Sequence, residues 1–320
     1  MQKAESRKQT ERGSDRAEPG VAGVMTAMGF AVVALAFSSI FITKLEQAEV
    51  PPLVIAFYRM TFATALLMPV ALVVKRREIA ALARRDLWLL AVGGLCLAVH
   101  FGAWITSLKY IPIATSVVLV NSHPVFVVLA SYLFLGEKPR TRSMLGTLTG
   151  LVGMAVISHD ALSGNGTTTS NNAIIGDGLA LLGALTVVGY FIIGRKARAR
   201  ISLLGYVTPL YAVCSVFLLI WILGTRDAAT PNPLYPYSAS VWAYFAALAV
   251  VPTILGHTVF NWALKHVRPS AISLAFLGEP VVASVLAFIF FSQRPPLATF
   301  IGGALVLAGV YLTTSSKQAA

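Results

Sequence analysis

The sequence predicts an all-α integral membrane protein with ten transmembrane helices, arranged as two inverted five-helix repeats. Composition is the first observation behind this prediction. Of the 320 residues, 57% are hydrophobic and only 12% are charged, whereas soluble domains average about 45–50% apolar and about 25% charged residues. The second observation is that the chain contains ten apolar runs, and the third is that its two halves match each other. The composition excludes a soluble, a disordered and a disulfide-rich secreted protein.

The apolar runs are separated by short segments that contain proline or charged residues. A membrane span needs about 20 apolar residues. Most of the runs reach this length, while the fifth and the tenth are shorter and rich in glycine. We therefore expect ten helices, at about 23–43, 52–74, 87–108, 113–135, 143–158, 174–194, 203–223, 240–263, 269–291 and 297–314.

The distribution of lysine and arginine predicts the orientation. With the N-terminus placed inside, twenty of these residues fall in inner segments and four in outer loops, and Arg59 lies within a span. Cytoplasmic loops carry this excess, so both termini are expected in the cytoplasm, with the chain in the cytoplasmic (inner) membrane of the cell. The net charge of +12 is then a mark of orientation. It predicts no nucleic-acid partner, because the basic residues form no single face.

Two segments fall outside the predicted repeats. Residues 1–22 mix basic and acidic side chains and are expected to form a disordered cytoplasmic tail, and residues 160–173, rich in Ser, Thr, Gly and Asn, an outer linker. Cys96 and Cys214 lie in apolar runs and are expected to be small buried residues.

The internal repeat appears when the sequence is shifted by 156 residues. Residues 109–158 then lie over residues 265–314 without a gap, and Pro124 meets Pro280 while Gly146 meets Gly302. The repeats are expected at 23–159 and 174–315. Because each holds five spans, an odd number, the second enters the membrane from the opposite side. Inverted repeats of this kind are common in secondary transporters.

Two stretches carry a resemblance to a known family. Gly256-His257-Thr258-x-Phe260-Asn261-Trp262 with Leu277-Gly278-Glu279-Pro280-Val281 is similar to the second repeat of EamA proteins, and Pro124-Val125-Phe126 with Leu135-Gly136-Glu137-Lys138-Pro139 to the first. EamA proteins belong to the drug/metabolite transporter superfamily. The resemblance covers nearly all of the chain after residue 22. It implies ten helices in two inverted repeats and, for many members, export of amino acids or other small metabolites.

Ionisable residues inside predicted spans are the best candidates for function, because a charge at the bilayer centre costs a few kcal/mol or more without a partner or a cavity. Glu279 and His123 correspond to each other in the two repeats, and each directly precedes a proline. Each proline frees a backbone carbonyl four residues earlier. Both residues are candidates for binding substrate or a proton. The alternative is that Glu279 is protonated or hydrogen-bonded to a neighbouring helix and serves packing.

Arg59 lies about seven residues inside the second predicted helix, next to Tyr58. Its guanidinium group suits a carboxylate-bearing substrate. An internal pair with Glu279, or extension of the side chain to the membrane surface, would also satisfy it. Tyr58 is a candidate for contact with the apolar part of the substrate.

Two pairs spaced four residues apart each share one helix face. They are His100 with Trp104 in the third helix and His257 with Asn261 in the eighth. Together with Asn121 they are predicted to line a polar, aromatic cavity. An interfacial tryptophan and a packing histidine would produce the same pattern.

These features predict a secondary active transporter that works by alternating access, and they leave open whether transport is coupled to protons. By resemblance, its substrate is a small polar, amino-acid-like metabolite that is exported. The sequence contains no P-loop, no His-Glu-x-x-His, no Cys-x-x-Cys and no Gly-x-Ser-x-Gly motif, so we expect no enzyme activity, no metal and no cofactor. An intramembrane enzyme or a channel is the alternative. The partners expected are the bilayer and the substrate, with the protein as a monomer or homodimer.

Overall fold

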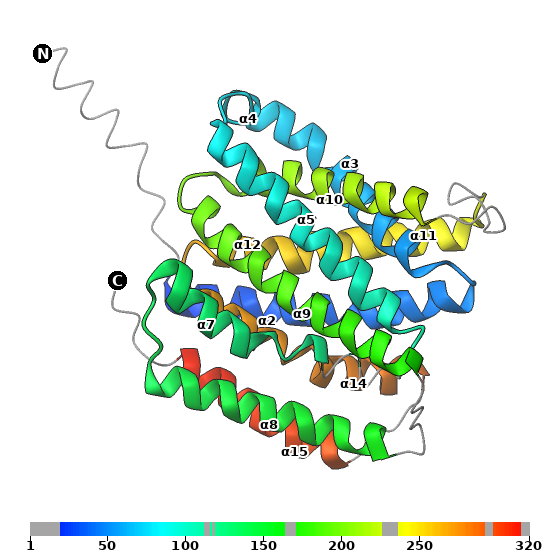
Figure 1. Cartoon of the computed structure of the whole chain (residues 1–320), viewed down its shortest axis with the longest axis vertical. Coiled ribbons are helices and arrows are strands. Elements are labelled where there is room, and N and C mark those ends of the chain that lie inside the picture. Colours follow the sequence, from blue (N-terminus) through cyan, green and yellow to red (C-terminus); the bar gives the residue numbers. More distant parts are fainter. Residues whose placement is uncertain are drawn as a thin grey trace, which may run out of the picture.

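The computed structural model describes residues 20–111, 116, 119–163, 171–225, 236–291 and 297–314. Most of the predicted tail and much of the predicted linker lie outside these ranges. Figure 1 shows long helices running along one bundle. In chain order they are α2 (Val21–Gln47), α3 (Pro52–Val74), α4 (Arg76–Ala80), α5 (Arg84–Ser107), α7 (His123–Leu135), α8 (Thr141–Ser163), α9 (Asn171–Arg198), α10 (Leu203–Gly224), α11 (Ala239–Leu248), the π-helix η1 (Ala249–His257), α12 (Thr258–Ala263), α13 (Pro269–Phe276), α14 (Glu279–Phe291) and α15 (Leu297–Thr314).

Seven helical segments of the described residues are long and apolar enough to span a membrane. They are α2, α3, α5, α9, α10, the segment from α11 to α12, and the segment from α13 to α14. The stretches 123–135 in α7 and 300–313 in α15 are shorter apolar helices. Many large apolar side chains are exposed, including Val73 at 85% and Tyr311 at 70%, as expected for helices that face lipid. The fold is therefore a helical membrane bundle.

Helix starts follow local sequence signals. Pro52 and Pro269 each occupy the first turn of a helix, where a missing N–H costs nothing. Ser202 precedes α10 and its hydroxyl accepts a hydrogen bond from the amide of Gly205 at 3.2 Å, a common N-terminal cap. Gly136 ends α7 with a φ of 69°, a conformation that favours glycine.

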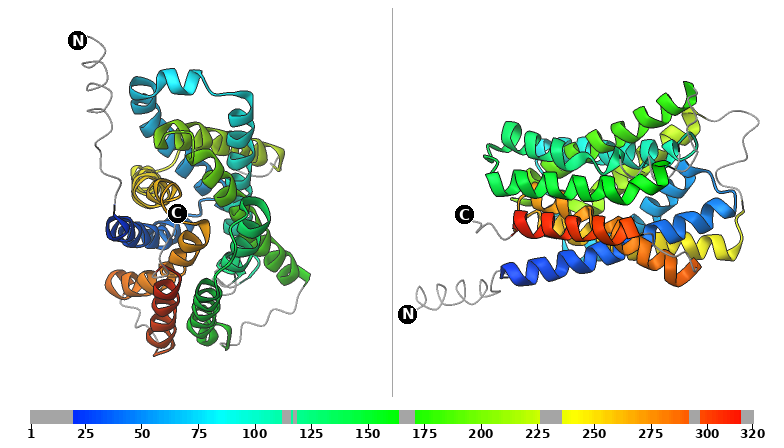
Figure 2. Two further views of the ribbon diagram at one scale, coloured as in Figure 1. Left: turned by 90° about the vertical axis from the view of Figure 1, so that its left-hand side faces the viewer. Right: turned by 90° about the horizontal axis from the view of Figure 1, so that it is seen from below.

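Both ends of the described chain lie at one end of the bundle. The start of α2 and the end of α15 are on the same side in two views (Figures 1 and 2). We call this the terminal end; α2 finishes at the opposite end. The helix pairs that pack along each other include α8 with α15, α5 with α9, α3 with α10, and α2 with η1.

The predicted continuous helix over 240–263 contains a wide turn. Residues 249–257 form the π-helix η1, which includes Pro252. Proline lacks an N–H and cannot bond the carbonyl of Leu248, four residues earlier. The hydroxyl of Thr253 donates to that carbonyl at 2.8 Å instead. The π-helix therefore keeps the segment continuous while satisfying the freed group.

The predicted continuous helix over 269–291 is corrected by the structure. It is broken into α13 and α14 by a turn at Leu277 and Gly278, so Glu279 begins a new helix. Likewise, α7 begins at His123 directly after a turn at Asn121 and Ser122. The physical reason is the same in both places, because Pro280 and Pro124 cannot donate a backbone hydrogen bond to the preceding turn.

Candidate functional site

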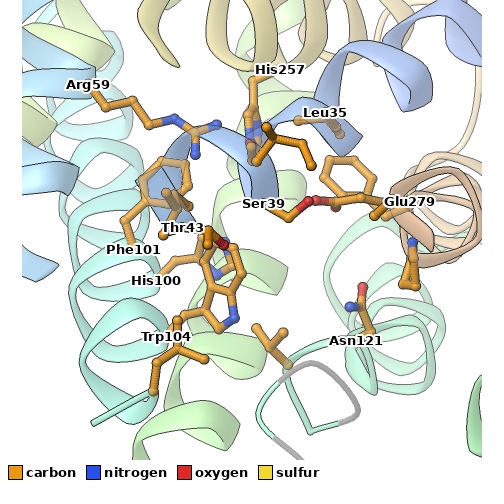
Figure 3. A pocket seen from close by; sticks show the side chains of 18 of the residues that line it. Leu35, Ser39, Thr43, Arg59, His100, Phe101, Trp104, Asn121, His257 and Glu279 are labelled. Atoms are coloured by element: carbon orange, nitrogen blue, oxygen red, sulfur yellow. The ribbon is translucent and has the colours of Figure 1, made fainter. Parts of the chain in front are cut away.

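A cavity of about 470 Å³ lies inside the bundle. Its walls come from both halves of the chain, and seven of the nine predicted site residues line it. The lining includes the polar and aromatic side chains of Ser39, Thr43, Glu46, Gln47, Arg59, His100, Phe101, Trp104, Asn121, His123, His257, Phe276 and Glu279, and the side chain of Val187. Figure 3 shows ten of the lining side chains labelled around the open space.

The cavity extends toward the opposite end of the bundle. Glu46 and Gln47, the last residues of α2, belong to its lining, and so does Leu108, directly after α5. A second, smaller hollow at the same end is lined by Glu46, Leu108 and the segment that begins α3. Small molecules would therefore enter this cavity from the opposite end.

Arg59 is 1% exposed and reaches the cavity from α3. Its Nε donates to the hydroxyl of Thr253 at 2.8 Å, and its guanidinium carbon lies 4.5 Å from the ring centroid of Phe101. Its Nη2 has no hydrogen-bond partner within the part of the chain that the structure describes. The guanidinium is thus fixed on one edge and has a donor left over for a ligand.

Glu279 lines the cavity at the first residue of α14. Within the described ranges no ion pair joins it to Arg59, and Figure 3 shows the two on opposite sides of the cavity. The helix break before Glu279 places the carboxyl group beside the cavity. A cation and an anion therefore face the same space from separate walls.

His123 begins α7 and is 3% exposed. Its Nδ1 lies 2.7 Å from the hydroxyl of Ser273 on α13, and its ring packs edge-on against Phe191 and Phe276. Asn121 lies two residues earlier and also lines the cavity. The two interrupted helices thus contribute His123 and Glu279 to the lining of the same cavity.

His100 and Trp104 line the cavity from one face of α5. Their rings are stacked, with centroids 6.1 Å apart, and His100 Nδ1 lies 2.9 Å from the carbonyl oxygen of Gly183 on α9. The indole Nε1 of Trp104 has no partner among the described atoms. This pair offers a flat aromatic wall and one free donor.

His257 ends η1 and is 5% exposed. Its ring packs against Phe101 and Phe276, with centroids 5.5 and 5.7 Å away. Its Nδ1 is without a hydrogen-bond partner in the described part of the molecule. Because the guanidinium group of Arg59 also packs on the ring of Phe101, His257 and Arg59 both contact this ring.

Tyr58 and Asn261 lie outside the cavity lining. Tyr58 packs in an aromatic cluster with Trp242 and Phe245, at centroid distances of 5.0 and 4.7 Å. Asn261 faces α9 and α10, where its amide nitrogen donates to the hydroxyl of Tyr190 at 2.5 Å. Neither side chain is placed to touch a ligand in the cavity, because the helices that carry them turn these residues toward neighbouring helices.

The polar face of α2 was not among the site residues predicted from the sequence. Ser39 does donate to the carbonyl of Ala36 at 2.9 Å, but it also lines the cavity with Thr43 and Gln47. These residues recur every four positions, which is one face of a helix. That spacing was the available signal. Thr253, the partner of Arg59, had no comparable signal.

The cavity can therefore hold a small molecule that carries both charges. Arg59, His257 and Trp104 each keep a ring or guanidinium nitrogen without a partner in the described structure, and Glu279 supplies a carboxyl group on another wall. Aliphatic side chains, among them Leu35, Ile40 and Ile42, form much of the remainder, with the rings of Phe101 and Phe276. Ionisable side chains that face a cavity within a membrane bundle make that cavity a candidate site for a substrate or ion.

This architecture is that of a multi-pass membrane protein of a transporter class. The chain belongs to the EamA-like transporter family, whose family model matches residues 22–159 and again residues 174–315. The family is one of transporters and not of enzymes, and membership implies a lipid bilayer and a small-molecule substrate as partners.

Several relatives are similar along most of their length. A pseudopaline exporter from Pseudomonas aeruginosa is 24% identical over 278 residues, covering 87% of this chain and 91% of the relative. A probable terminal-alkyne amino-acid exporter from Streptantibioticus cattleyicolor is 27% identical over 238 residues, with 71% and 73% covered. An uncharacterized transporter from Archaeoglobus fulgidus is 27% identical over 285 residues, with 88% and 93% covered.

A solved crystal structure shares the fold. It superposes with a TM-score of 0.73 at 19% identity and covers 90% of this chain and 96% of its own. At this identity the likeness concerns the fold alone.

Proposed function

We propose that the chain is a secondary active transporter that exports a small amino-acid-like metabolite across the cytoplasmic membrane by alternating access. One observation carries the proposal. The cavity lies between the two segments matched by the family model, extends toward one end of the bundle, and holds Arg59 and Glu279 on separate walls. The names of two relatives as exporters, one of them of an amino acid, support the substrate class.

Ten membrane helices in two inverted repeats are part of the proposal, with α7, α8 and α15 completing the set. Packing of α8 on α15 supports the inversion. A Cβ added at Gly146 would lie 2.6 Å from the carbonyl oxygen of Gly309, and one added at Gly153 would lie 2.5 Å from that of Gly302. In the 156-residue repeat, Gly146 corresponds to Gly302 and Gly153 to Gly309. The two contacts are thus exchanged by the repeat, as a two-fold axis requires.

Two inverted repeats explain how one fold reaches two states of similar energy. If each repeat adopts the conformation of the other, the cavity opens to the other end of the bundle. Both ends of the described chain lie at the terminal end, and the excess of basic residues in the inner segments supports a cytoplasmic side for it. In this orientation the cavity of the present structure extends toward the outside.

Substrate recognition follows from the charges. A substrate carboxylate would accept hydrogen bonds from Arg59 and its neighbour His257, while Glu279 or His123 would bind an ammonium group or take up a proton. The stacked rings of His100 and Trp104 would contact the apolar part of the substrate. Tyr58 and Asn261 would act indirectly, by packing against the helices that carry these residues.

A substrate panel tests the proposal. The purified protein in proteoliposomes is offered amino acids together with two truncated analogues of each, the amine that lacks the carboxylate and the acid that lacks the ammonium group. Saturable transport of the amino acids and weak transport of both analogues is the expected result. Equal transport of all three would contradict recognition by Arg59 and Glu279, and transport of none would remove the amino-acid assignment.

Proton coupling is tested at Glu279. We expect Glu279→Gln to abolish the dependence of transport on a pH gradient while the folded protein is retained, because glutamine keeps the shape but cannot exchange a proton. His123→Gln is the matched comparison at the corresponding repeat position. If Glu279→Gln leaves transport and its pH dependence intact, the proton role of Glu279 is wrong.

A further inference from the structure

The bundle is closed on the side of the cavity that faces the terminal end. Val187 of α9 and His257 of η1 line the cavity, and both helices continue from there toward the terminal end (Figure 1). Tyr190 and Asn261 follow about one helical turn further along, roughly 5 to 6 Å at 1.5 Å per residue. The side chains beyond the cavity on these two helices therefore decide whether the terminal end is open or shut.

An aromatic layer comes first. Phe276 lines the cavity and packs against Phe191 and Phe260, with ring centroids 5.5 and 4.5 Å apart. All three rings are buried. This layer separates the cavity from the polar groups beyond it.

A polar layer follows, centred on Asn261, which is 1% exposed. Its amide nitrogen donates to the hydroxyl of Tyr190 and, at 2.9 Å, to the carbonyl of His257. Arg198 Nε donates to the carbonyl of Asn261 at 3.1 Å, and Arg198 Nη1 to the carbonyl of Ile201. The last turn of α9 is thus tied to α12, next to the cavity wall.

A further set of contacts connects the two matched segments. Arg195 Nη1 donates to the carbonyl of Leu264 at 2.6 Å, and Arg195 Nε lies 3.7 Å from Glu137 Oε1. Glu137 follows α7 in the first segment, whereas Arg195 and Leu264 belong to the second. Arg195 therefore joins the end of α9, the end of α12 and the α7–α8 connection.

The tie between Arg195 and Glu137 is weak enough to break. Its 3.7 Å separation exceeds the 2.7–2.9 Å of a charge-assisted hydrogen bond. Burial raises the pKa of Glu137, although the nearby guanidinium groups of Arg195 and Arg268 act to lower it. Glu137 Oε2 also lacks a hydrogen-bond partner in the described structure. The negative charge of Glu137 is therefore only partly balanced by hydrogen bonds and by the neighbouring cations in this conformation.

The helices at the closed end correspond in sequence position to helices at the open side of the cavity. The helix α2 ends at Gln47 and α3 begins at Pro52, while α9 ends at Arg198 and α10 begins at Leu203. Both connections are equally long, so α2 and α3 can be aligned with α9 and α10. In this alignment Tyr190 corresponds to Ser39 and Arg198 to Gln47, and Ser39 and Gln47 line the open side of the cavity. Corresponding helix positions therefore line the cavity toward the opposite end but form hydrogen bonds that close the bundle toward the terminal end.

We propose that Arg195, backed by Arg198 and Asn261, is the gate that closes the cavity toward the terminal end, and that its contact with Glu137 breaks when this end opens. The proposal rests on the alternating access argued above. It assigns Arg195 to a conformational step, with no contact to the substrate. The open pathway would run between α9, α12 and the α7–α8 connection.

Thiol labelling tests the gate without any substrate. In a Cys96→Ser, Cys214→Ala background, Val187→Cys places a single thiol in the cavity wall. A membrane-impermeant maleimide is added to the terminal side in one set of vesicles and to the opposite side in another. Arg195→Gln is expected to raise the labelling rate from the terminal side at least threefold and to lower it from the opposite side.

Two further variants complete the design. Arg85→Gln removes an exposed cation at the same end and should leave both rates unchanged, while the exchange Glu137→Arg with Arg195→Glu should restore the original rates. Unchanged rates in Arg195→Gln, an equal rise in Arg85→Gln, or a rise from both sides, which marks general loosening, would each overturn the gate. The proposed function fails separately, through absence of saturable transport by the otherwise unaltered chain.

Discussion

At the scale of single residues, the cavity is defined by charged groups that burial makes costly. Arg59 is held by Thr253 and the ring of Phe101, and retains one free Nη2 in the described structure. A buried guanidinium with no carboxylate at ion-pair distance among the described residues is stable only if something in the cavity, water or a ligand, satisfies its remaining donor. We assign that role during transport to a substrate carboxylate.

Replacement of Arg59 tests this assignment. Arg59→Lys keeps the charge but loses the planar fork that binds a carboxylate with two hydrogen bonds, so apparent affinity should fall roughly tenfold or more, equivalent to about 1.4 kcal/mol. Arg59→Gln should cost about 2–5 kcal/mol. Substrate titrations of transport measure both, with thermal unfolding as the control for folding. A variant that folds and transports with unchanged affinity would contradict the role.

Most of the candidate site could be predicted from the sequence, because ionisable side chains in apolar runs are rare and must face a cavity or a partner. This reasoning found Arg59, His123 and Glu279. It placed Tyr58 and Asn261 in the same site, whereas they face neighbouring helices, because adjacency in sequence does not decide which way a side chain points. It left the serines of α2 out of the site, although a serine can bond its own helix and line a cavity at once.

At the scale of helices, the approximate positions of most of them followed from the apolar runs, and the errors lie at prolines. A proline predicts a disturbance but not its form. The structure shows a π-helix at Pro252 and complete breaks before His123 and Glu279. Tertiary contacts decide between these forms, for example the hydroxyl of Thr253 that satisfies the carbonyl of Leu248. Such a contact cannot be read from local sequence.

Glycine at the α8–α15 contact gives a prediction on packing. A Cβ at Gly309 would lie 2.5 Å from the carbonyl oxygen of Gly146, so Gly309→Ala should force the helices apart and destabilise the fold by roughly 1–3 kcal/mol. Gly29→Ala in α2 is the matched control, since a Cβ there meets nothing within 4 Å. Thermal unfolding in detergent compares them. Equal stability of the two variants would mean that α8 and α15 do not pack as described.

The connection between α4 and α10 gives a prediction on pH. Burial acts to raise the pKa of Glu78, but hydrogen bonds from Ser202, whose amide lies 2.6 Å from Oε1, together with the ammonium group of Lys75, leave it lowered. A lowered pKa stabilises the fold above the unfolded value of about 4.3, and this contribution is lost as the pH falls through the folded value.

Glu78→Gln should therefore lower the unfolding temperature at pH 7, by the equivalent of about 1 kcal/mol or less because the group is partly exposed. The gap between this variant and the original chain should stay constant from pH 7 to about 5 and narrow as the pH falls below the unfolded value of about 4.3. Thermal unfolding at a series of pH values measures it. A gap that stays constant down to about pH 3 would show that ionised Glu78 contributes nothing to the connection.

At the scale of the whole molecule, the two ends of the bundle differ, since the cavity reaches one end and is closed toward the other. The cavity reaches the opposite end of the bundle through α2 and α5, while aromatic packing, the bonds of Arg195 and Arg198, and the pair Asp86–Arg200 at 2.6 Å close the terminal end. A fold whose halves can exchange roles would invert this asymmetry. That inversion is what alternating access means here, and it separates a transporter from a channel, which is open to both sides at once.

Trans-stimulation tests this central claim most directly. Proteoliposomes that contain the protein are loaded with an unlabelled transported amino acid or with buffer, and initial uptake of the labelled compound is measured. An alternating-access carrier returns faster when loaded, so we predict several-fold faster initial uptake into the loaded vesicles, saturating with concentration and weakened by Arg59→Lys. Uptake that does not saturate and is the same in loaded and empty vesicles would contradict the account.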